Sequence, residues 1–159
     1  APLRQRNQRG LGQMTPLRCL SLAALLTIAF DVMAAETRPS GIQWRTWSDD
    51  LLDEARDQGR FLLLNLTAPW CAFCQKMKSV TYRDQGVEAV VREHYIPVRI
   101  DDEGDPALAE RYSGYGRPAS VVMDADGREL IRRLGYLEPQ LMTWMLQAVV
   151  RNPDPDAHR

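Results

Sequence analysis

The chain has 159 residues, of which 45% are hydrophobic, and its 20 basic residues nearly balance its 21 acidic ones, so the formal charge is −1. This composition suits a globular domain with one core. Basic side chains are scattered among acidic ones along the whole sequence, which is typical of a solvated surface, so nucleic acid is not expected as a partner.

The N-terminal segment has the layout of a secretory signal peptide. A positively charged stretch ending at Arg18 precedes an apolar run over residues 20–30, which is too short to span a bilayer comfortably. Small residues follow at Ala34 and Ala35, where cleavage is expected. We therefore predict residues 1–35 as an upstream extension and signal peptide, and a periplasmic or secreted mature protein. An uncleaved membrane anchor is the alternative.

After this segment we predict one domain over residues 36–151 and a mobile polar tail over residues 152–159. Removing the first 35 residues leaves 159 − 35 = 124 residues, a length that suits one domain. Four arginines and one aspartate are lost with them, so the formal charge moves from −1 to −4. The mature protein is therefore expected to be mildly acidic. We also expect it to be a monomer.

The elements of this domain follow from its apolar pattern. Ser48 is predicted as the N-cap of a helix over residues 49–58, with Gly59 as its stop. The continuous apolar run Phe61–Thr67 predicts a buried central strand. The further elements, in chain order, are predicted as a helix from residue 75 to about 81, helical turns over 87–93, a strand over 95–100, a helix over 106–112, a strand over 119–123, a turn over 124–127, a strand over 129–134 and a helix over 139–150. On the last helix, six apolar side chains are expected largely on one face: Leu141, Met142, Trp144, Met145, Ala148 and Val149.

The sequence Trp70-Cys71-Ala72-Phe73-Cys74 lies between the central strand and the next helix. The N-terminus of that helix offers unpaired N–H groups and a positive dipole end, which stabilise a thiolate on Cys71. Cys71 is expected to be partly exposed and to attack a substrate disulfide, and Cys74 is placed to resolve the mixed disulfide. The pattern predicts a redox dithiol that needs no metal or organic cofactor.

A structural disulfide and a metal site are the alternatives for these two cysteines. A structural zinc site needs about four ligands, and beyond the motif the chain offers only Cys19, in the predicted signal peptide, and the histidines His94 and His158. Soft thiolates also suit Cu(I), which leaves a non-catalytic copper-binding or chaperone module as a competing function. No methionine- or histidine-rich stretch lies near the motif, which disfavours that function.

The order βαβ, hairpin and helix, with a WCxxC after the central strand, resembles the thioredoxin fold over residues 42–150. The resemblance is to exported thioredoxin-like thiol–disulfide oxidoreductases. It implies the α/β class, with a central mixed four-stranded β-sheet flanked by helices. Pro118 is similar to the cis-proline that faces the CxxC in this family, and the backbone of Arg117 would then pair with an extended substrate chain.

The same resemblance places Trp70 beside Cys71, where it would shape the substrate surface together with Ala72 and Phe73. The dipeptide between the cysteines has neither the proline of common reductases nor the histidine of strong oxidants. The absence of the histidine favours a reducing protein, because a histidine there stabilises the thiolate and raises the potential.

One departure from the family concerns proton transfer. Many thioredoxins carry a buried aspartate six residues before the first active-site cysteine, and this chain has Asn65 there. The lysine partner of that aspartate falls near Pro97. Asparagine cannot take a proton, so solvent or a carboxylate such as Glu54 or Asp101 must deprotonate Cys74. We expect slower resolution of mixed disulfides than in a typical thioredoxin, unless Asn65 is simply a hydrogen-bonded strand residue.

The sequence thus predicts an exported enzyme that reduces protein disulfides. Outside the cytoplasm such a reductase needs a membrane thiol-reductant transporter to re-reduce it. An oxidase or isomerase of the same fold is the alternative, and the reduction potential distinguishes them.

Overall fold

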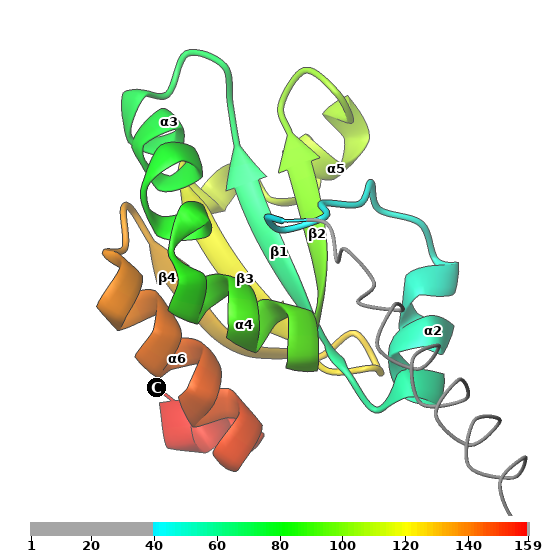
Figure 1. Cartoon of the computed structure of the whole chain (residues 1–159). Coiled ribbons are helices and arrows are strands. Elements are labelled where there is room, and N and C mark those ends of the chain that lie inside the picture. The colour runs from blue at the N-terminus through cyan, green and yellow to red at the C-terminus, as the bar shows by residue number, and fades with distance from the viewer. Residues whose placement is uncertain (1–39, 159) are drawn as a thin grey trace, which may run out of the picture. The chain divides into compact units, whose positions relative to one another are not determined.

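A mixed sheet of four strands forms the centre of the computed structural model, which describes residues 40–158 (Figure 1). The strands are β1 (Phe61–Thr67), β2 (Tyr95–Asp101), β3 (Ala119–Met123) and β4 (Glu129–Leu134), in the spatial order β2-β1-β3-β4. β1 runs parallel to β2 and antiparallel to β3, which pairs antiparallel with β4. The predicted fold class is confirmed. The predicted signal peptide, with Cys19 and its cleavage site, lies outside the described residues.

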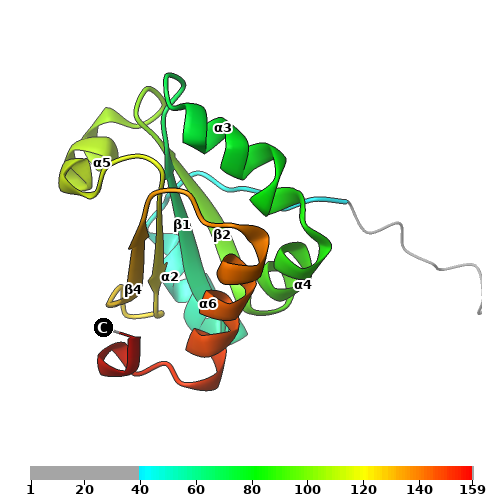
Figure 2. The same cartoon turned by 90° about the vertical axis from the view of Figure 1, so that its left-hand side faces the viewer.

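Helices cover both faces of this sheet, as Figures 1 and 2 show. Their bounds are α2 Asp50–Gln58, α3 Ala72–Ser79, α4 Gln85–His94, α5 Pro106–Arg111 and α6 Pro139–Arg151, with 3₁₀ turns at Thr81–Arg83, Ser113–Tyr115 and Pro155–His158. One cluster of buried side chains joins α3, α4 and α6 to one face of the sheet, and a second joins α2 and the α5 region to the other. No helix among residues 40–158 is long and apolar enough to cross a membrane.

The central strand β1 reads as a continuous apolar run because both of its faces are buried. Leu62 and Leu64 belong to the cluster under α2, whereas Leu63 belongs to the cluster under α3, α4 and α6. All three are fully buried. The alternation of side chains along a strand therefore places β1 at the middle of both cores, and its carboxyl end leads directly to the cysteine motif.

The start of the first helix differs from the prediction. Asp49, not Ser48, precedes the first helical residue, and its side chain makes no capping hydrogen bond. Ser48 contributes only its backbone carbonyl, which accepts from the N–H of Leu51 at 3.1 Å. Gly59 ends the helix as predicted, with a left-handed φ of 61° that favours glycine.

The last helix was correctly placed, but its apolar face was predicted too broadly. Leu141 and Trp144 are 50% and 57% exposed. The buried side chains follow the i, i+3, i+4, i+7 spacing of a single helical stripe, and they are Met142, Met145, Leu146 and Val149. Within the predicted polar tail, the 3₁₀ turn Pro155–His158 lies beside β4, where Arg133 donates to the carbonyl of His158 at 3.4 Å. The mobility of this tail stays a prediction.

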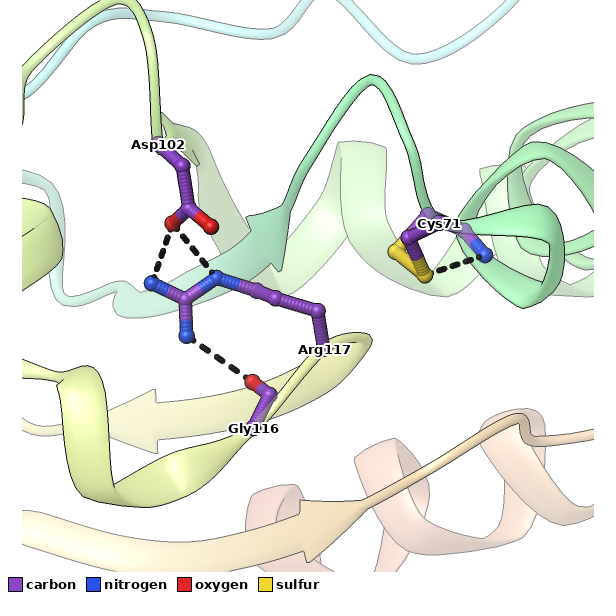
Figure 3. The surroundings of a disulfide bond; sticks show 5 residues. Cys71, Asp102, Gly116 and Arg117 are labelled. Atoms are coloured by element: carbon purple, nitrogen blue, oxygen red, sulfur yellow. Dashed lines mark hydrogen bonds and ion pairs between the residues drawn. A yellow bond between two sulfur atoms is a disulfide. The ribbon is translucent and has the colours of Figure 1, made fainter.

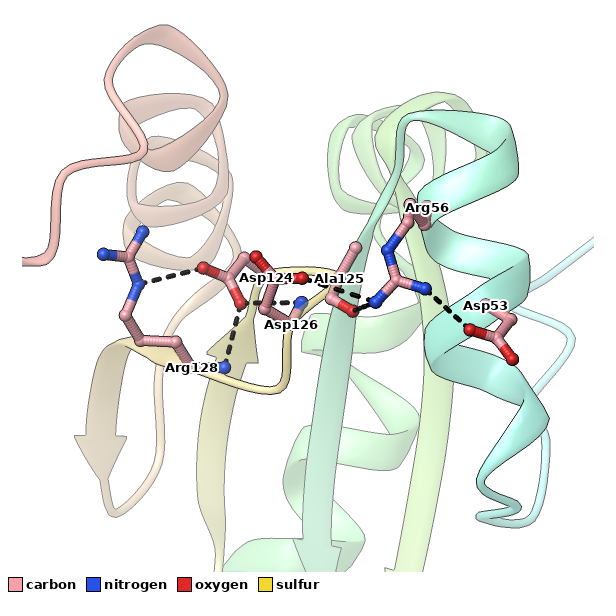
Figure 4. A network of polar contacts seen from close by, with 6 residues as sticks. All are labelled: Asp53, Arg56, Asp124, Ala125, Asp126 and Arg128. Atoms are coloured by element: carbon pink, nitrogen blue, oxygen red, sulfur yellow. Dashed lines mark hydrogen bonds and ion pairs between the residues drawn. The ribbon is translucent and has the colours of Figure 1, made fainter.

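The hairpin between β3 and β4 is held by its own aspartates (Figure 4). The carboxylate of Asp124 accepts from the N–H groups of Asp126 and Arg128, at 3.0 and 2.8 Å. Arg56 of α2 donates to the carbonyl of Ala125 at 3.0 Å. These contacts fasten the turn to α2, at the end of β3 opposite the cysteine motif.

Helix α4 offers a test of capping. The carboxylate of Asp84 accepts from the N–H groups of Gly86 and Val87, at 2.9 and 3.1 Å. We expect Asp84→Ala to lower the free energy of unfolding by about 1 kcal/mol, because two helix-terminal N–H groups lose their partner. Asp49→Ala is the matched control, since Asp49 precedes α2 without a capping bond. Urea unfolding of both variants checks this, and equal losses would contradict it.

Candidate active site

The structure joins Cys71 and Cys74 in a disulfide at the N-terminus of α3, with their Cα atoms 5.2 Å apart (Figure 3). Cys71 is the N-cap residue of α3 and has an extended backbone, and its sulfur accepts from the N–H of Cys74 at 3.1 Å. A thiolate at this position would receive the same hydrogen bond and the positive end of the helix dipole. The predicted cysteine pair is therefore assembled at the predicted place.

Both cysteines are buried, although partial exposure was predicted for Cys71. Cys71 is 5% and Cys74 is 4% exposed, and they pack with Ala68 in a small cluster. The expected partial exposure of Cys71 is thus corrected for this oxidised form. The flanking side chains are exposed instead, Trp70 to 73% and Phe73 to 61%. The disulfide therefore lies at the base of an apolar rim.

Tyr136 extends this rim, although sequence reasoning gave it no role. It lies in the connection from β4 to α6, and its ring centroid is 6.3 Å from that of Phe73. The Nζ atom of Lys76 lies 4.3 Å from the centroid of the Tyr136 ring, a cation–π distance. No local sequence signal places Tyr136 beside α3, because the approach depends on how β4 and α6 pack.

The segment before β3 brings Arg117 and Pro118 to the same edge of the sheet. The peptide bond between these two residues is cis. The carbonyl of Pro118 accepts from the N–H of Gly135 at 2.8 Å. Within residues 40–158, the N–H and carbonyl of Arg117 make no backbone hydrogen bond. Backbone groups without such a bond at the edge of a sheet can accept an extended peptide.

The side chain of Arg117 has its own partners. Its Nε and Nη2 atoms lie 2.8 and 2.5 Å from Oδ1 of Asp102, which directly follows β2. Only 5% of the Arg117 side chain is exposed. The sequence predicted a role for the backbone of Arg117 but not this ion pair, because the two residues are distant in sequence and belong to no shared motif.

Asn65 is buried on the face of β1 that α3 covers, and it is 6% exposed. The strand register sets it opposite Arg99 of β2 and Ser120 of β3. Ser120 and the hydroxyl of Tyr82 lie 3.3 Å apart, and burial raises the pKa of Tyr82 above its ordinary value. The buried groups here are therefore hydroxyls and an amide, and the cation of Arg99, which is only partly buried, lies over the ring of Trp44 at 5.4 Å.

Glu54 is not placed to serve as the proton acceptor. It lies on α2, whose buried side chains pack on the face of the sheet opposite α3. A hydrogen bond from Arg45 at 2.5 Å lowers the pKa of Glu54. Asp101 ends β2, and its carboxylate accepts from the N–H of Glu103. The structure therefore corrects the suggestion of Glu54 and leaves Asp101 untested.

Fold and site together define a thioredoxin-like thiol–disulfide oxidoreductase domain with a CxxC disulfide. Residues 32–130 match the family model Thioredox_DsbH, described as "Protein of unknown function, DUF255". The match covers more than half of the chain, and the chain belongs to this family.

One curated relative and two solved structures are similar to this chain, and the two structures show the shared fold. The thiol:disulfide interchange protein DsbD of Ralstonia nicotianae is 32% identical over 92 residues, which are 55% of this chain and 15% of that protein. The chain thus spans only a small part of that relative. A thioredoxin from Thermus thermophilus has a TM-score of 0.60 at 21% identity, over 69% of this chain and 88% of that one. A solved DsbH oxidoreductase has a TM-score of 0.56 at 20% identity, over 74% of this chain and 90% of that one.

Proposed function

We propose that this protein reduces disulfides in other proteins, with Cys71 as the nucleophile and Cys74 as the resolving thiol. The observation that carries the proposal is the position of the Cys71 sulfur. It caps the N-terminus of α3 and accepts a backbone N–H there. This environment lowers the pKa of a thiol and so supplies the attacking thiolate near neutral pH.

The reaction proceeds in two exchanges. The Cys71 thiolate attacks one sulfur of the substrate disulfide, and the other substrate sulfur leaves as a thiolate that takes a proton. Cys74 then loses its proton and attacks the sulfur of Cys71 in the mixed disulfide. The second substrate thiolate leaves, and the two electrons gained by the substrate come from the pair, which ends as the Cys71–Cys74 disulfide.

Substrate recognition would use the surface around this disulfide. An extended substrate segment pairs with the free backbone groups of Arg117, beside Pro118. The exposed side chains of Trp70, Ala72 and Phe73 contact the residues on either side of the substrate cysteine. An apolar rim of this kind favours binding of unfolded or flexible protein segments over small-molecule disulfides.

The proposal extends to export and to an electron donor. The N-terminal signal pattern supports a periplasmic or secreted protein, and the relative from Ralstonia is named for thiol:disulfide interchange. An exported reductase must receive electrons across the membrane, so a membrane thiol-reductant transporter is the expected partner. The motif dipeptide Ala72-Phe73 supports the reducing direction, because it lacks a thiolate-stabilising histidine.

The reduction potential tests the direction of electron flow. We expect the Cys71–Cys74 couple to equilibrate near −270 mV in defined thiol/disulfide buffers, as in reducing members of the fold. Alkylation of the free thiols followed by mass measurement gives the reduced fraction. A value near −120 mV would assign the protein to oxidation of substrates. A titration with Cu(I) beside an insulin-reduction assay separates turnover from metal storage.

A further inference from the structure

The side chain of Arg117 turns away from the disulfide and toward the end of β2, as Figure 3 shows. Two of its nitrogens bind one carboxylate oxygen of Asp102. Its Nη1 atom also donates to the carbonyls of Gly116, at 2.8 Å, and of Tyr112, at 3.3 Å. Its Nη2 atom reaches the carbonyl of Ala109 in α5 at 3.5 Å. One guanidinium therefore connects the end of β2, the end of α5 and the loop before Pro118.

Burial makes this connection rigid. The side chains of Arg117 and Asp102 are 5% and 27% exposed, so water competes little for their hydrogen bonds. Charge-assisted hydrogen bonds are stronger than neutral ones, and the planar fork of arginine fixes the direction of several at once. A lysine at the same position is a single point charge on a flexible stem and cannot hold all these acceptors together.

The loop that this guanidinium holds needs an external restraint. It contains Gly114 and Gly116, and Gly116 has a φ of 69°. Glycine has more conformational freedom than any other residue, so such a loop loses more entropy when it is ordered. The backbone groups offered to a substrate strand belong to Arg117, the residue that ends this loop. Fixing its side chain orders its backbone before the substrate arrives, which lowers the cost of binding.

We propose that Arg117 is a positioning residue: its side chain, paired with Asp102, orders the substrate-binding backbone before the substrate arrives. This ordering determines the preference of the protein for protein disulfides over small-molecule disulfides. This inference rests on the proposed function. A protein substrate pairs along the Arg117 backbone, whereas a small disulfide needs only access to the Cys71 sulfur. Loosening the loop therefore weakens protein reduction more than small-disulfide reduction.

The neighbouring surface agrees with this role. A cavity of about 380 Å³ is lined by residues from both sides of the ion pair, and they include Trp70, Asp102, Ala109, Glu110, Gly116 and Arg117. The cavity reaches Trp70, the residue directly before the nucleophile Cys71. This cavity has room for a side chain of the substrate next to the backbone of Arg117. The Arg117–Asp102 ion pair forms part of the cavity wall.

The test uses Arg117→Lys and Asp102→Asn in the full chain, with Arg128→Lys as the matched control. Arg128 pairs with Asp124 at 2.9 Å in the exposed hairpin at the other end of the sheet (Figure 4). Initial rates are measured with reduced protein, against insulin and against the small aromatic disulfide 5,5′-dithiobis(2-nitrobenzoate). We expect both site variants to raise KM for insulin about 10-fold. The ratio of the insulin to the small-disulfide kcat/KM should fall by a similar factor, and the control should keep the wild-type ratio.

Each outcome has a distinct meaning. Urea unfolding identifies a variant that is merely unstable, and Asp102→Asn is the gentler change because it keeps the size of the side chain. If both folded variants keep the wild-type ratio, the positioning role is wrong. If the wild type reduces neither substrate, the proposed function is wrong, and amide hydrogen exchange of residues 113–117 then decides the inference alone. Exchange there should rise in Arg117→Lys, and unchanged exchange would overturn the role.

Discussion

Replacing Cys71 by serine is expected to lower the rate of insulin reduction by at least about 10³-fold, to the background set by the thiol reagent alone. Serine is close in size to cysteine, but its hydroxyl is not ionised near neutral pH and forms no mixed disulfide. The N-cap hydrogen bond from Cys74 can still be accepted by the serine oxygen, so the helix should remain folded. Turbidity from the precipitating insulin chain measures the rate.

The variant Cys74→Ser is the companion of this experiment. Cys71 keeps its place at the N-terminus of α3 and can still attack, but the mixed disulfide cannot be resolved within the protein. A covalent complex with substrate should therefore accumulate and be visible by non-reducing electrophoresis. If Cys74→Ser were fully inactive while Cys71→Ser formed the complex, the roles of the two cysteines would be exchanged.

Leu63→Ala is expected to lower the free energy of unfolding by about 2–5 kcal/mol. Leu63 is fully buried at the middle of β1, in the cluster that contains Met77 of α3 and Val122 of β3. Its truncation leaves a cavity between the sheet and the helix that carries the cysteines, and the neighbours relax only partly. Such a loss is a large share of the 5–15 kcal/mol typical of a domain. Urea unfolding of the oxidised protein measures it.

Leu141→Ala is the control for this substitution. The same atoms are removed from α6, but Leu141 is half exposed and alanine is a strong helix former. The loss should stay below about 1 kcal/mol. A loss equal to that of Leu63→Ala would show that stability does not concentrate at β1, contrary to the packing of both clusters against this strand.

The strands β1 and β3 were predictable because their side chains are buried on both faces, whereas β4, with three exposed residues at its end, was placed by the hairpin turn that precedes it. The bounds of β1, β3 and β4 agree with the runs seen in the sequence. The first residue of a helix was harder to predict than the bounds of a strand. Ser48 and Asp49 are both good N-cap residues, and the direction of the backbone decides which of them precedes α2. On α6 the buried face was predicted too broadly, because every apolar side chain was assigned to it. Leu141 and Trp144 are apolar, but they lie beside the buried stripe and are exposed.

The sequence by itself determined the local chemistry of this protein. The spacing of Cys71 and Cys74 between a buried strand and a helix start places both sulfurs within one helical turn, and this depends only on residues adjacent in the chain. The glycine and aspartates of the hairpin likewise act within a few residues. Such features can be read without the fold because their distances are set by covalent geometry.

Only the tertiary structure decided what surrounds the disulfide. The approach of Tyr136 to Phe73, the ion pair of Arg117 with Asp102 and the opposite-face position of Glu54 depend on how separate elements pack. Whole helices or strands separate such partners in the chain, and the order of the strands in the sheet differs from their order in sequence. No local pattern records these contacts, because the same residues in another packing would have other neighbours.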